Sequence, residues 1–343
     1  MPINANQRFN ALMQGEIPDR VPVVCNLFEQ GARELGMSIE TYYSRGEYVA
    51  QGQIKLQEKY GYDNIWGTHY TAQDCEMLGS KKTIFVEDGP PNVGHLILRS
   101  EKDIERLTID ESLLETKPFL ELLKTIEIIK REKGDQCPVL SAVIASFSMP
   151  PILMGMDKWL DLLLTGSVKI RNLLLKKCSD FCIMKTKALF NAGVDMVSYS
   201  NPVATASFLS LEQFKTMALP WINRDINTLG PQGIVYFNGG GLLNPMIDTI
   251  IENTGVGAVY IHPMDDIRQA KEIIGGRALL AASINDIPLI KWSNDDIDRE
   301  VKRIMDAGKE GGGFIFGTLS MPFGISHDKI KTMLEAAVRY GQY

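Results

Sequence analysis

Two of the four histidines of this sequence, His69 and His262, directly follow short apolar segments that we expect to be β-strands. An imidazole at such a position can act as a general base or as a metal ligand. A hydrogen-bonded structural imidazole is the alternative at both positions. Tyr236 lies near the end of a third apolar segment, "GIVYFN", and its phenol can also transfer a proton. These three residues are the catalytic candidates, and His262 is the first choice.

Further polar and aromatic side chains lie at or just after the ends of such segments, and we expect them to contact a substrate. Glu29 and Asn26 could in addition ligate a metal, because carboxylate and amide oxygens coordinate hard cations. Phe147 and Trp66 favour an apolar or aromatic substrate. The predicted substrate-binding residues are Asn26, Glu29, Tyr70, Phe147, Ser198, Asn201, Asn238 and Ser320.

Eight short apolar segments alternate with amphipathic helical patterns along the chain. Their continuous apolarity is typical of parallel strands that are covered on both faces. Eight β–α units predict an α/β fold, a (β/α)₈ TIM barrel. An open doubly wound sheet is the alternative, but "VPVVCNLFEQG" lacks the glycine fingerprint usual after its first strand. The expected strands are 21–25, 63–68, 139–145, 195–200, 233–238, 257–262, 277–283 and 313–318.

Two stretches exceed the minimal β–α unit. Residues 79–100 contain "DGPPNVG" between strand-like runs and predict a β-hairpin inserted after the second strand. Residues 4–20 predict a helix and turn before the first strand, placed to plug the lower end of the barrel. Because no linker or repeat interrupts the pattern, we expect a single domain over 1–343. Active sites of such barrels gather at the C-terminal ends of the strands, where the candidate residues stand.

The composition excludes several classes of function. The 343 residues are 45% hydrophobic and 23% charged, and a net charge of −6 without a basic tract argues against a nucleic-acid partner. The sequence has no apolar run of the roughly 18 residues that span a bilayer, and its start does not resemble a secretory signal. The five cysteines form no C-x-x-C pair. We therefore expect a cytoplasmic protein with no membrane partner.

Three segments resemble the uroporphyrinogen decarboxylase superfamily, whose members are (β/α)₈ barrels. They are "RFNALMQGEIPDRVPV", "FNAGVDMVSYSNPVATASFLSLEQF" and "GGFIFGTLSMPFGISHDKIKTMLEAA". The second resembles the branch of cobamide (corrinoid)-dependent methyltransferases. The decarboxylases bind substrate carboxylates through an "RQAGR" motif, whereas this chain has "EQGAR", so Glu29 replaces one arginine and only Arg33 matches. Their catalytic aspartate matches Tyr70, so uroporphyrinogen decarboxylation is not expected.

The resemblance also implies a zinc site that this chain lacks in its usual form. Thiol-methylating members of the branch carry zinc on an H-x-C pair after the fifth strand and on a cysteine after the eighth. The matching residues here are Tyr236, Asn238 and Ser320. A phenol, an amide and a hydroxyl do not replace an imidazole and two thiolates on zinc. Zinc would need other ligands in this chain, such as Glu29, His69 or His262.

The resemblance therefore implies the demethylating component of a corrinoid methyl-transfer system. Its cofactor would be cobalamin carried by a separate corrinoid-binding protein. Gly239 and Gly240 would let the flat corrin approach, and Tyr236 and Asn238 would line the pocket of a small methylated substrate. An aryl methyl ether, a thioether and a quaternary amine are the candidate donors. The alternatives are methyl transfer from the corrinoid protein to a non-thiol acceptor such as a folate, and a non-catalytic binding barrel.

Overall fold

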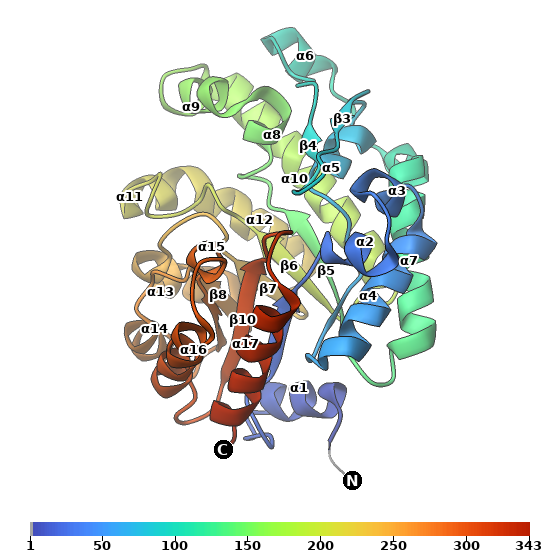
Figure 1. Ribbon diagram of the computed structural model, residues 1–343. Helices are drawn as coiled ribbons and strands as arrows, with labels where there is room; N and C mark the ends of the chain where they lie inside the picture. Colours follow the sequence, from blue (N-terminus) through green and yellow to red (C-terminus); the bar gives the residue numbers. More distant parts are fainter. Residues whose placement is uncertain (1–2) are drawn as a thin grey trace.

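Eight parallel strands form the centre of the molecule, for which the computed structural model describes residues 3–343 (Figure 1). Each expected strand segment overlaps one of them, and the spatial order is β1-β10-β9-β8-β7-β6-β5-β2. Their bounds are β1 Val23–Asn26, β2 Ile65–Trp66, β5 Val139–Ile144, β6 Met196–Ser200, β7 Ile234–Phe237, β8 Ala258–Ile261, β9 Leu279–Ile284 and β10 Phe314–Ser320.

The two end strands of this order, β1 and β2, are joined partly through a side chain. The Asp63 amide, two residues before β2 begins, donates to Val23 O at 2.8 Å. The amide of Cys25 donates to Asn64 Oδ1 at 2.9 Å. The Asn64 amide group thus takes the place of a backbone partner and closes the barrel. The predicted (β/α)₈ fold is confirmed.

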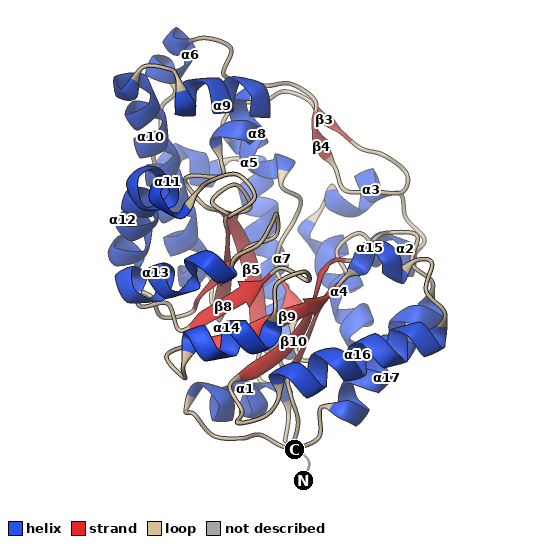
Figure 2. Ribbon diagram, turned by 90° about the vertical axis from the view of Figure 1, so that its left-hand side faces the viewer, coloured by secondary structure: helices blue, strands red, loops and turns tan. Residues whose placement is uncertain are grey.

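Helices cover the outside of the barrel (Figure 2). The covering helices are α2 Gln30–Leu35, α3 Ile39–Tyr43, α4 Gly46–Tyr60, α7 Lys117–Lys133, α10 Val168–Asn191, α12 Leu219–Leu229, α13 Asn244–Thr254, α14 Ile267–Ile274, α16 Asn294–Gly308 and α17 His327–Tyr340. Shorter helices follow the strand ends or belong to insertions. They are α5 Ala72–Met77, α6 Glu101–Arg106, α8 Pro150–Met154, α9 Met156–Leu164, α11 Leu211–Gln213 and α15 Asp286–Leu289, with a 3₁₀ turn at Glu111–Glu115 and a π turn at Phe214–Ala218.

The N-terminal helix α1, Ala5–Met13, lies across the lower end of the barrel in Figure 1. Asn4 and Gln7 form a capping box that fixes its first turn. Arg8 anchors it through a buried ion pair with Asp63, 2.7 Å from Nη1 to Oδ1. Phe9 is almost completely buried and lines the barrel cavity. The predicted N-terminal helical extension is confirmed. Because Phe9 lines the cavity, the helix forms the floor of the barrel interior.

The predicted hairpin after the second strand is confirmed as well. Strands β3, Thr83–Ile84, and β4, Asn92–Val93, pair antiparallel above the barrel (Figure 1). The hairpin is held to the barrel by Leu98, whose amide donates to Leu153 O at 3.0 Å.

Apolar side chains gather in two main layers. The larger layer lies between the strands and the outer helices and includes Trp159, Phe181 and Phe316. A separate cluster that includes Phe9 and Tyr260 fills part of the barrel interior.

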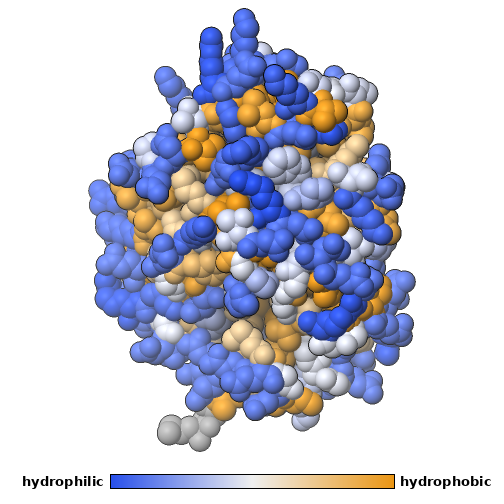
Figure 3. All heavy atoms as spheres, turned by 180° about the vertical axis from the view of Figure 1, so that it is seen from behind, coloured by the Kyte–Doolittle hydropathy of each residue, from blue (hydrophilic) through white to orange (hydrophobic). Residues whose placement is uncertain are grey.

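Seen from behind, the surface is mostly hydrophilic with apolar patches between the charged side chains (Figure 3). Within residues 3–343, no helix is both long and apolar enough to cross a bilayer.

A candidate active site inside the barrel

The barrel interior is hollow, and the burial pattern of its strands shows it. On β6 the inward-facing residues Met196, Ser198 and Ser200 are half-buried, while Val197 and Tyr199 between them are fully buried beneath the helices. Strands β5 and β7 show the same alternation near their C-terminal ends. Side-chain layers normally fill this type of barrel. Here the interior contains a cavity of about 320 Å³ that reaches the C-terminal ends of the strands.

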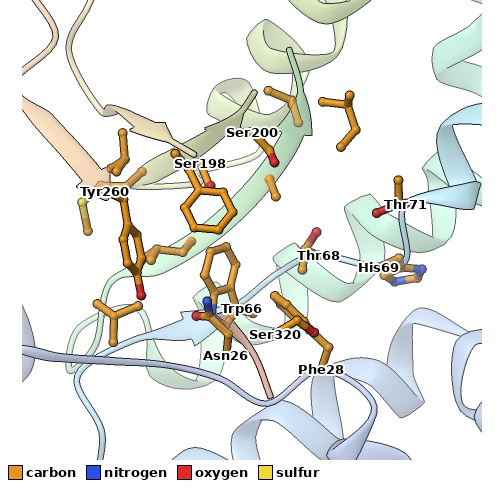
Figure 4. Close-up of a pocket in the computed structure, with 18 of the residues that line it drawn as sticks. Asn26, Phe28, Trp66, Thr68, His69, Thr71, Ser198, Ser200, Tyr260 and Ser320 are labelled. Carbon is orange, nitrogen blue, oxygen red and sulfur yellow. The ribbon is translucent and has the colours of Figure 1, made fainter. Parts of the chain in front are cut away.

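Aromatic rings form much of the cavity wall. Phe28 and Trp66 meet edge to face, with ring centroids 5.3 Å apart. Phe237 and Tyr260 form a similar pair at 5.0 Å. Figure 4 shows Tyr260 on one side of the cavity, Trp66 near its centre, and Thr68, His69 and Thr71 on the other side. Of the residues predicted from the sequence to form a site, the cavity is lined by Asn26, Glu29, His69, Tyr70, Ser198 and Ser320.

Glu29 supplies a buried carboxyl group to the cavity. It stands at the start of α2, and only 4% of the residue is exposed. Its Oε1 accepts a hydrogen bond from Tyr43 Oη at 3.1 Å. Burial raises the pKa of Glu29, because the charged form loses its hydration. A carboxyl group in this environment is suited to donate a proton.

Asn26 orients the indole of Trp66. Its Oδ1 accepts a hydrogen bond from Trp66 Nε1 at 2.8 Å, and its Nδ2 donates to Thr318 O at 2.6 Å. Both the oxygen and the nitrogen of the Asn26 amide group therefore form hydrogen bonds within the protein. Its contribution to the cavity is the placement of an aromatic wall.

His69 is buried and neutral. Its Nδ1 lies 3.2 Å from Gln73 Nε2, and its Nε2 lies 2.9 Å from Thr125 Oγ1. Because the Gln73 amide nitrogen can only donate, Nδ1 accepts and Nε2 carries the proton. Burial, with a smaller effect of the Lys185 charge, lowers the pKa of His69 to about 3. A neutral imidazole held at both nitrogens is not a proton donor at neutral pH.

An ion pair in the cavity wall was not predicted from the sequence. Asp74 on α5 and Lys185 on α10 both line the cavity, are nearly inaccessible to solvent, and are joined by a hydrogen-bonded ion pair. The sequence does hold a signal for Lys185, since it is a charged residue one turn after Cys182 on an apolar helix face.

Tyr236 lies outside the cavity, which differs from the prediction. Its neighbours on β7, Val235 and Phe237, line the cavity, so Tyr236 points the other way and is completely buried. Its hydroxyl accepts from Asn201 Nδ2 at 3.1 Å, and Asn201 Oδ1 accepts from Ser148 Oγ at 2.6 Å. Burial raises the pKa of the Tyr236 phenol. Tyr236 and Asn201 thus hold the loop after β6 against β7.

The glycines after β7 are explained by packing within the chain. A Cβ on Gly240 would lie 2.5 Å from Pro202 O, and one on Gly241 would lie 2.2 Å from Ser207 Oγ. A Cβ on Gly239 would lie 2.9 Å from an edge carbon of the Phe237 ring. Asn238 is completely buried and donates to Gly241 O, which closes the turn. We predicted that Gly239 and Gly240 would let the corrin approach. In the structure a side chain at either position would meet a neighbour within the chain, and the approach of a corrin stays a prediction.

His262 and Phe147 also stand apart from the cavity lining. His262 is half-buried at the end of β8, and its Nδ1 accepts from the Met264 amide at 3.2 Å. Phe147 is completely buried against Trp159, with ring centroids 5.6 Å apart. Neither His262, a predicted catalytic residue, nor Phe147, a predicted substrate contact, lines the cavity, and each has contacts within the protein.

The residues present do not fit a zinc ion of the kind that the resemblance implies. Tyr236 and Asn238 face away from the cavity, and Ser320 alone of the three matching positions lines it. Over the described range 3–343, no cluster of three or more histidine, cysteine or acidic side chains has the geometry to hold a metal. We derive no step through zinc.

The uroporphyrinogen decarboxylase (URO-D) family pattern matches residues 4–340. The chain belongs to this family. It is 24% identical over 311 residues to the methylcobamide:CoM methyltransferase MtbA of Methanosarcina mazei, a match that covers 88% of this chain and 89% of that protein. A uroporphyrinogen decarboxylase of Geotalea daltonii is 23% identical over 227 residues, or 64% of each chain.

A solved structure of a methyltransferase from Methanosarcina mazei shares the fold. It superposes with a TM-score of 0.85 at 18% identity and covers 98% of this chain and 99% of its own. The resemblance predicted from the sequence is confirmed at the level of the family. The matches to the methyltransferases span more of the chain than the match to the decarboxylase does.

Proposed function

We propose that this protein transfers a methyl group from a small methylated ether to the Co(I) corrinoid of a partner protein. The observation that carries the proposal is the buried carboxyl group of Glu29 in a largely apolar cavity, partly walled by aromatic rings, that reaches the C-terminal end of the barrel. The relatives named as methylcobamide methyltransferases support a corrinoid as the second reactant. The direction of transfer and the donor are the parts that the proposal adds.

The chemistry places one demand on this chain. As the ether C–O bond breaks, its electron pair stays on the oxygen, and the methyl carbon takes its new electron pair from Co(I), which becomes Co(III). The oxygen leaves as an alkoxide or phenoxide unless it receives a proton. Glu29 supplies that proton, and solvent restores it after the product leaves. General acid catalysis of this kind contributes about 10²–10⁴-fold to a rate.

The surroundings of Glu29 suit this role. Its carboxyl group is protonated over a wider pH range than a free one, because burial raises its pKa. His69 is not suited, because its pKa is lowered to about 3. We therefore assign the proton transfer to Glu29 in place of His262, Tyr236 and His69.

The loops at the cavity mouth offer a surface for the corrinoid protein. Five apolar side chains on the segments that follow β6, β7, β8 and β9 are exposed, with relative exposures between 42% and 76%. Exposed apolar side chains grouped at one end of a molecule are typical of protein contact sites. They are Phe208, Leu242, Met264, Ile287 and Ile290.

The direct test is an absorbance assay with a Co(I) corrinoid protein and a panel of methyl ethers, thioethers and methylamines. We expect conversion to the methyl-Co(III) spectrum with ethers. Glu29→Gln should lower the rate by at least 10²-fold with a methoxyarene whose phenol is a poor leaving group. The loss should shrink with nitro-substituted methoxyarenes, because their phenoxides leave without a proton.

Two results would contradict the proposal. One is a lack of conversion with every donor while the corrinoid is methylated by methyl iodide in a control. The other is a loss in Glu29→Gln that does not depend on the leaving group. Methylation of a folate from a methylcorrinoid protein would instead support the reverse direction.

A further inference from the structure

Three small side chains account for the empty space inside the barrel. Ala142 on β5, Ser198 on β6 and Ala281 on β9 face inward at the level where large residues usually interdigitate. Ala142 and Ser198 are paired neighbours in the register of β5 and β6. Ala281 lies beside Tyr260 of β8 and Ile315 of β10 in the same way.

The space is bounded by rings. Phe9 of α1 forms the floor, and the rings of Phe237, Tyr260 and Trp66 line the cavity above it. Figure 4 shows Tyr260 on one side of the cavity and Trp66 near its centre. The Tyr260 ring is fixed in place, because its hydroxyl donates to Thr318 O at 2.7 Å. Walls of this kind present both ring faces and ring edges, which are the surfaces that an aromatic ligand contacts best.

The charges in the wall argue against a cationic ligand. Asp74 is neutralised by Lys185 within the wall itself. Burial favours the neutral form of the Glu29 carboxyl group. A bound quaternary ammonium group would therefore contact aromatic faces, but it would find no net negative charge in the wall to balance its own charge. A neutral aromatic ring needs no negative charge in the wall.

We infer that the hollow barrel binds the aromatic ring of a methoxyarene, with Ala142 and Ala281 setting the size of ring that fits. The ring lies above Phe9 among Trp66, Phe237 and Tyr260, and the methoxy oxygen lies toward Glu29 at the mouth. This inference rests on the proposed function for the identity of the reacting group. The ring site itself is independent of turnover.

The test is calorimetric binding of phenol and methoxybenzene without any corrinoid. We expect both to bind the unmodified protein. Ala142→Leu and Ala281→Leu should each weaken binding by at least tenfold, because the added carbons occupy the ring site. Ala188→Leu, on the outer helix α10 and half-buried, is the matched control and should leave the affinity unchanged.

Ala281→Gly complements these variants, because it removes volume instead of adding it to a packed wall. It should improve binding of 2-methoxynaphthalene relative to methoxybenzene by several-fold. Equal affinities of all four variants for phenol, or a preference of the protein for tetramethylammonium over phenol, would overturn the inference.

The same variants separate this inference from the proposed function. If phenol binds and the Leu variants lose that binding while no methyl donor is turned over, the ring site stands and the proposed reaction fails. If methyl ethers are turned over at equal rates in the Ala142→Leu and Ala281→Leu proteins, the reaction stands and the ring site fails.

Discussion

The hydroxyl of Tyr260 occupies the space that a side chain on Gly317 would need. A Cβ on Gly317 would lie 1.9 Å from Tyr260 Oη and 2.7 Å from its Cζ. Gly317 lies in the middle of β10, where glycine is otherwise unfavourable. The glycine is thus required by the tyrosine, whose ring forms one wall of the cavity.

Gly317→Ala should therefore displace the Tyr260 ring into the cavity. We expect a loss of roughly 1–3 kcal/mol in the free energy of unfolding, as for other overpacked sites. Tyr260→Phe should cost only about 1 kcal/mol, because Thr318 O keeps its hydrogen bond from Asn26. Chemical denaturation of both variants measures the difference. A smaller loss for Gly317→Ala than for Tyr260→Phe would contradict the close approach.

The ion pair of Asp74 and Lys185 provides a second prediction. Asp74→Asn leaves a buried ammonium group without its counter-charge and should cost about 3–5 kcal/mol of stability. The double variant Asp74→Asn with Lys185→Met removes both charges, so it should be more stable than Asp74→Asn alone. Urea denaturation of the two single variants and the double variant gives the coupling energy. Additive losses would show that the two side chains do not interact.

The fold could be predicted from the sequence because each parallel strand is covered on both faces. That burial leaves a continuous apolar run of recognisable length. The same burial hides which side chains point inward, since an alternating pattern is lost. Tyr236 and Phe237 are adjacent aromatic residues, yet only Phe237 lines the cavity. If the inward-facing positions of a strand are assigned one residue off, every side chain expected in the barrel interior falls between strand and helices, and the reverse.

Other parts of the site depend on packing between distant segments. Lys185 lies on a helix outside the barrel, and its side chain meets Asp74, 111 residues earlier, only in the folded chain. The hollow depends on small residues on separate strands, such as Ala142 and Ala281. Small residues at the same level of several strands cannot be recognised from any one segment of the sequence. Glu29, in contrast, lines the cavity close to where the sequence indicates, because it follows β1 by only three residues. Its contact with a substrate stays a prediction.

The closure of the barrel predicts a cost for changes at Asn64. Asn64→Ala would leave the Cys25 amide without the acceptor that it has at 2.9 Å. A buried amide without a partner costs about 1–3 kcal/mol. Asn64→Asp keeps an acceptor for Cys25 but loses the donor, so it serves as the comparison. Amide hydrogen exchange at Cys25 should accelerate in Asn64→Ala, and an unchanged exchange rate would show that β1 and β2 are held by other contacts.

The buried imidazole of His69 should make the stability of this protein fall in mild acid. Its pKa is lowered from an ordinary value of 6.5 to about 3 in the folded state. Below pH 6.5 the unfolded chain therefore takes up a proton at this residue while the folded chain does not, and unfolding becomes easier. The loss of stability is absent above pH 6.5 and grows by about 1.4 kcal/mol per pH unit between pH 6 and pH 4.

His69→Asn removes the titrating group while keeping an acceptor for Gln73. The variant will be less stable than the unmodified protein at pH 7.5, where the contacts of the imidazole are intact. The gap should narrow steadily on acidification in urea titrations at matched ionic strength, and a gap that stays constant from pH 7.5 to pH 4.5 would mean that His69 is protonated in the folded protein as readily as in the unfolded chain.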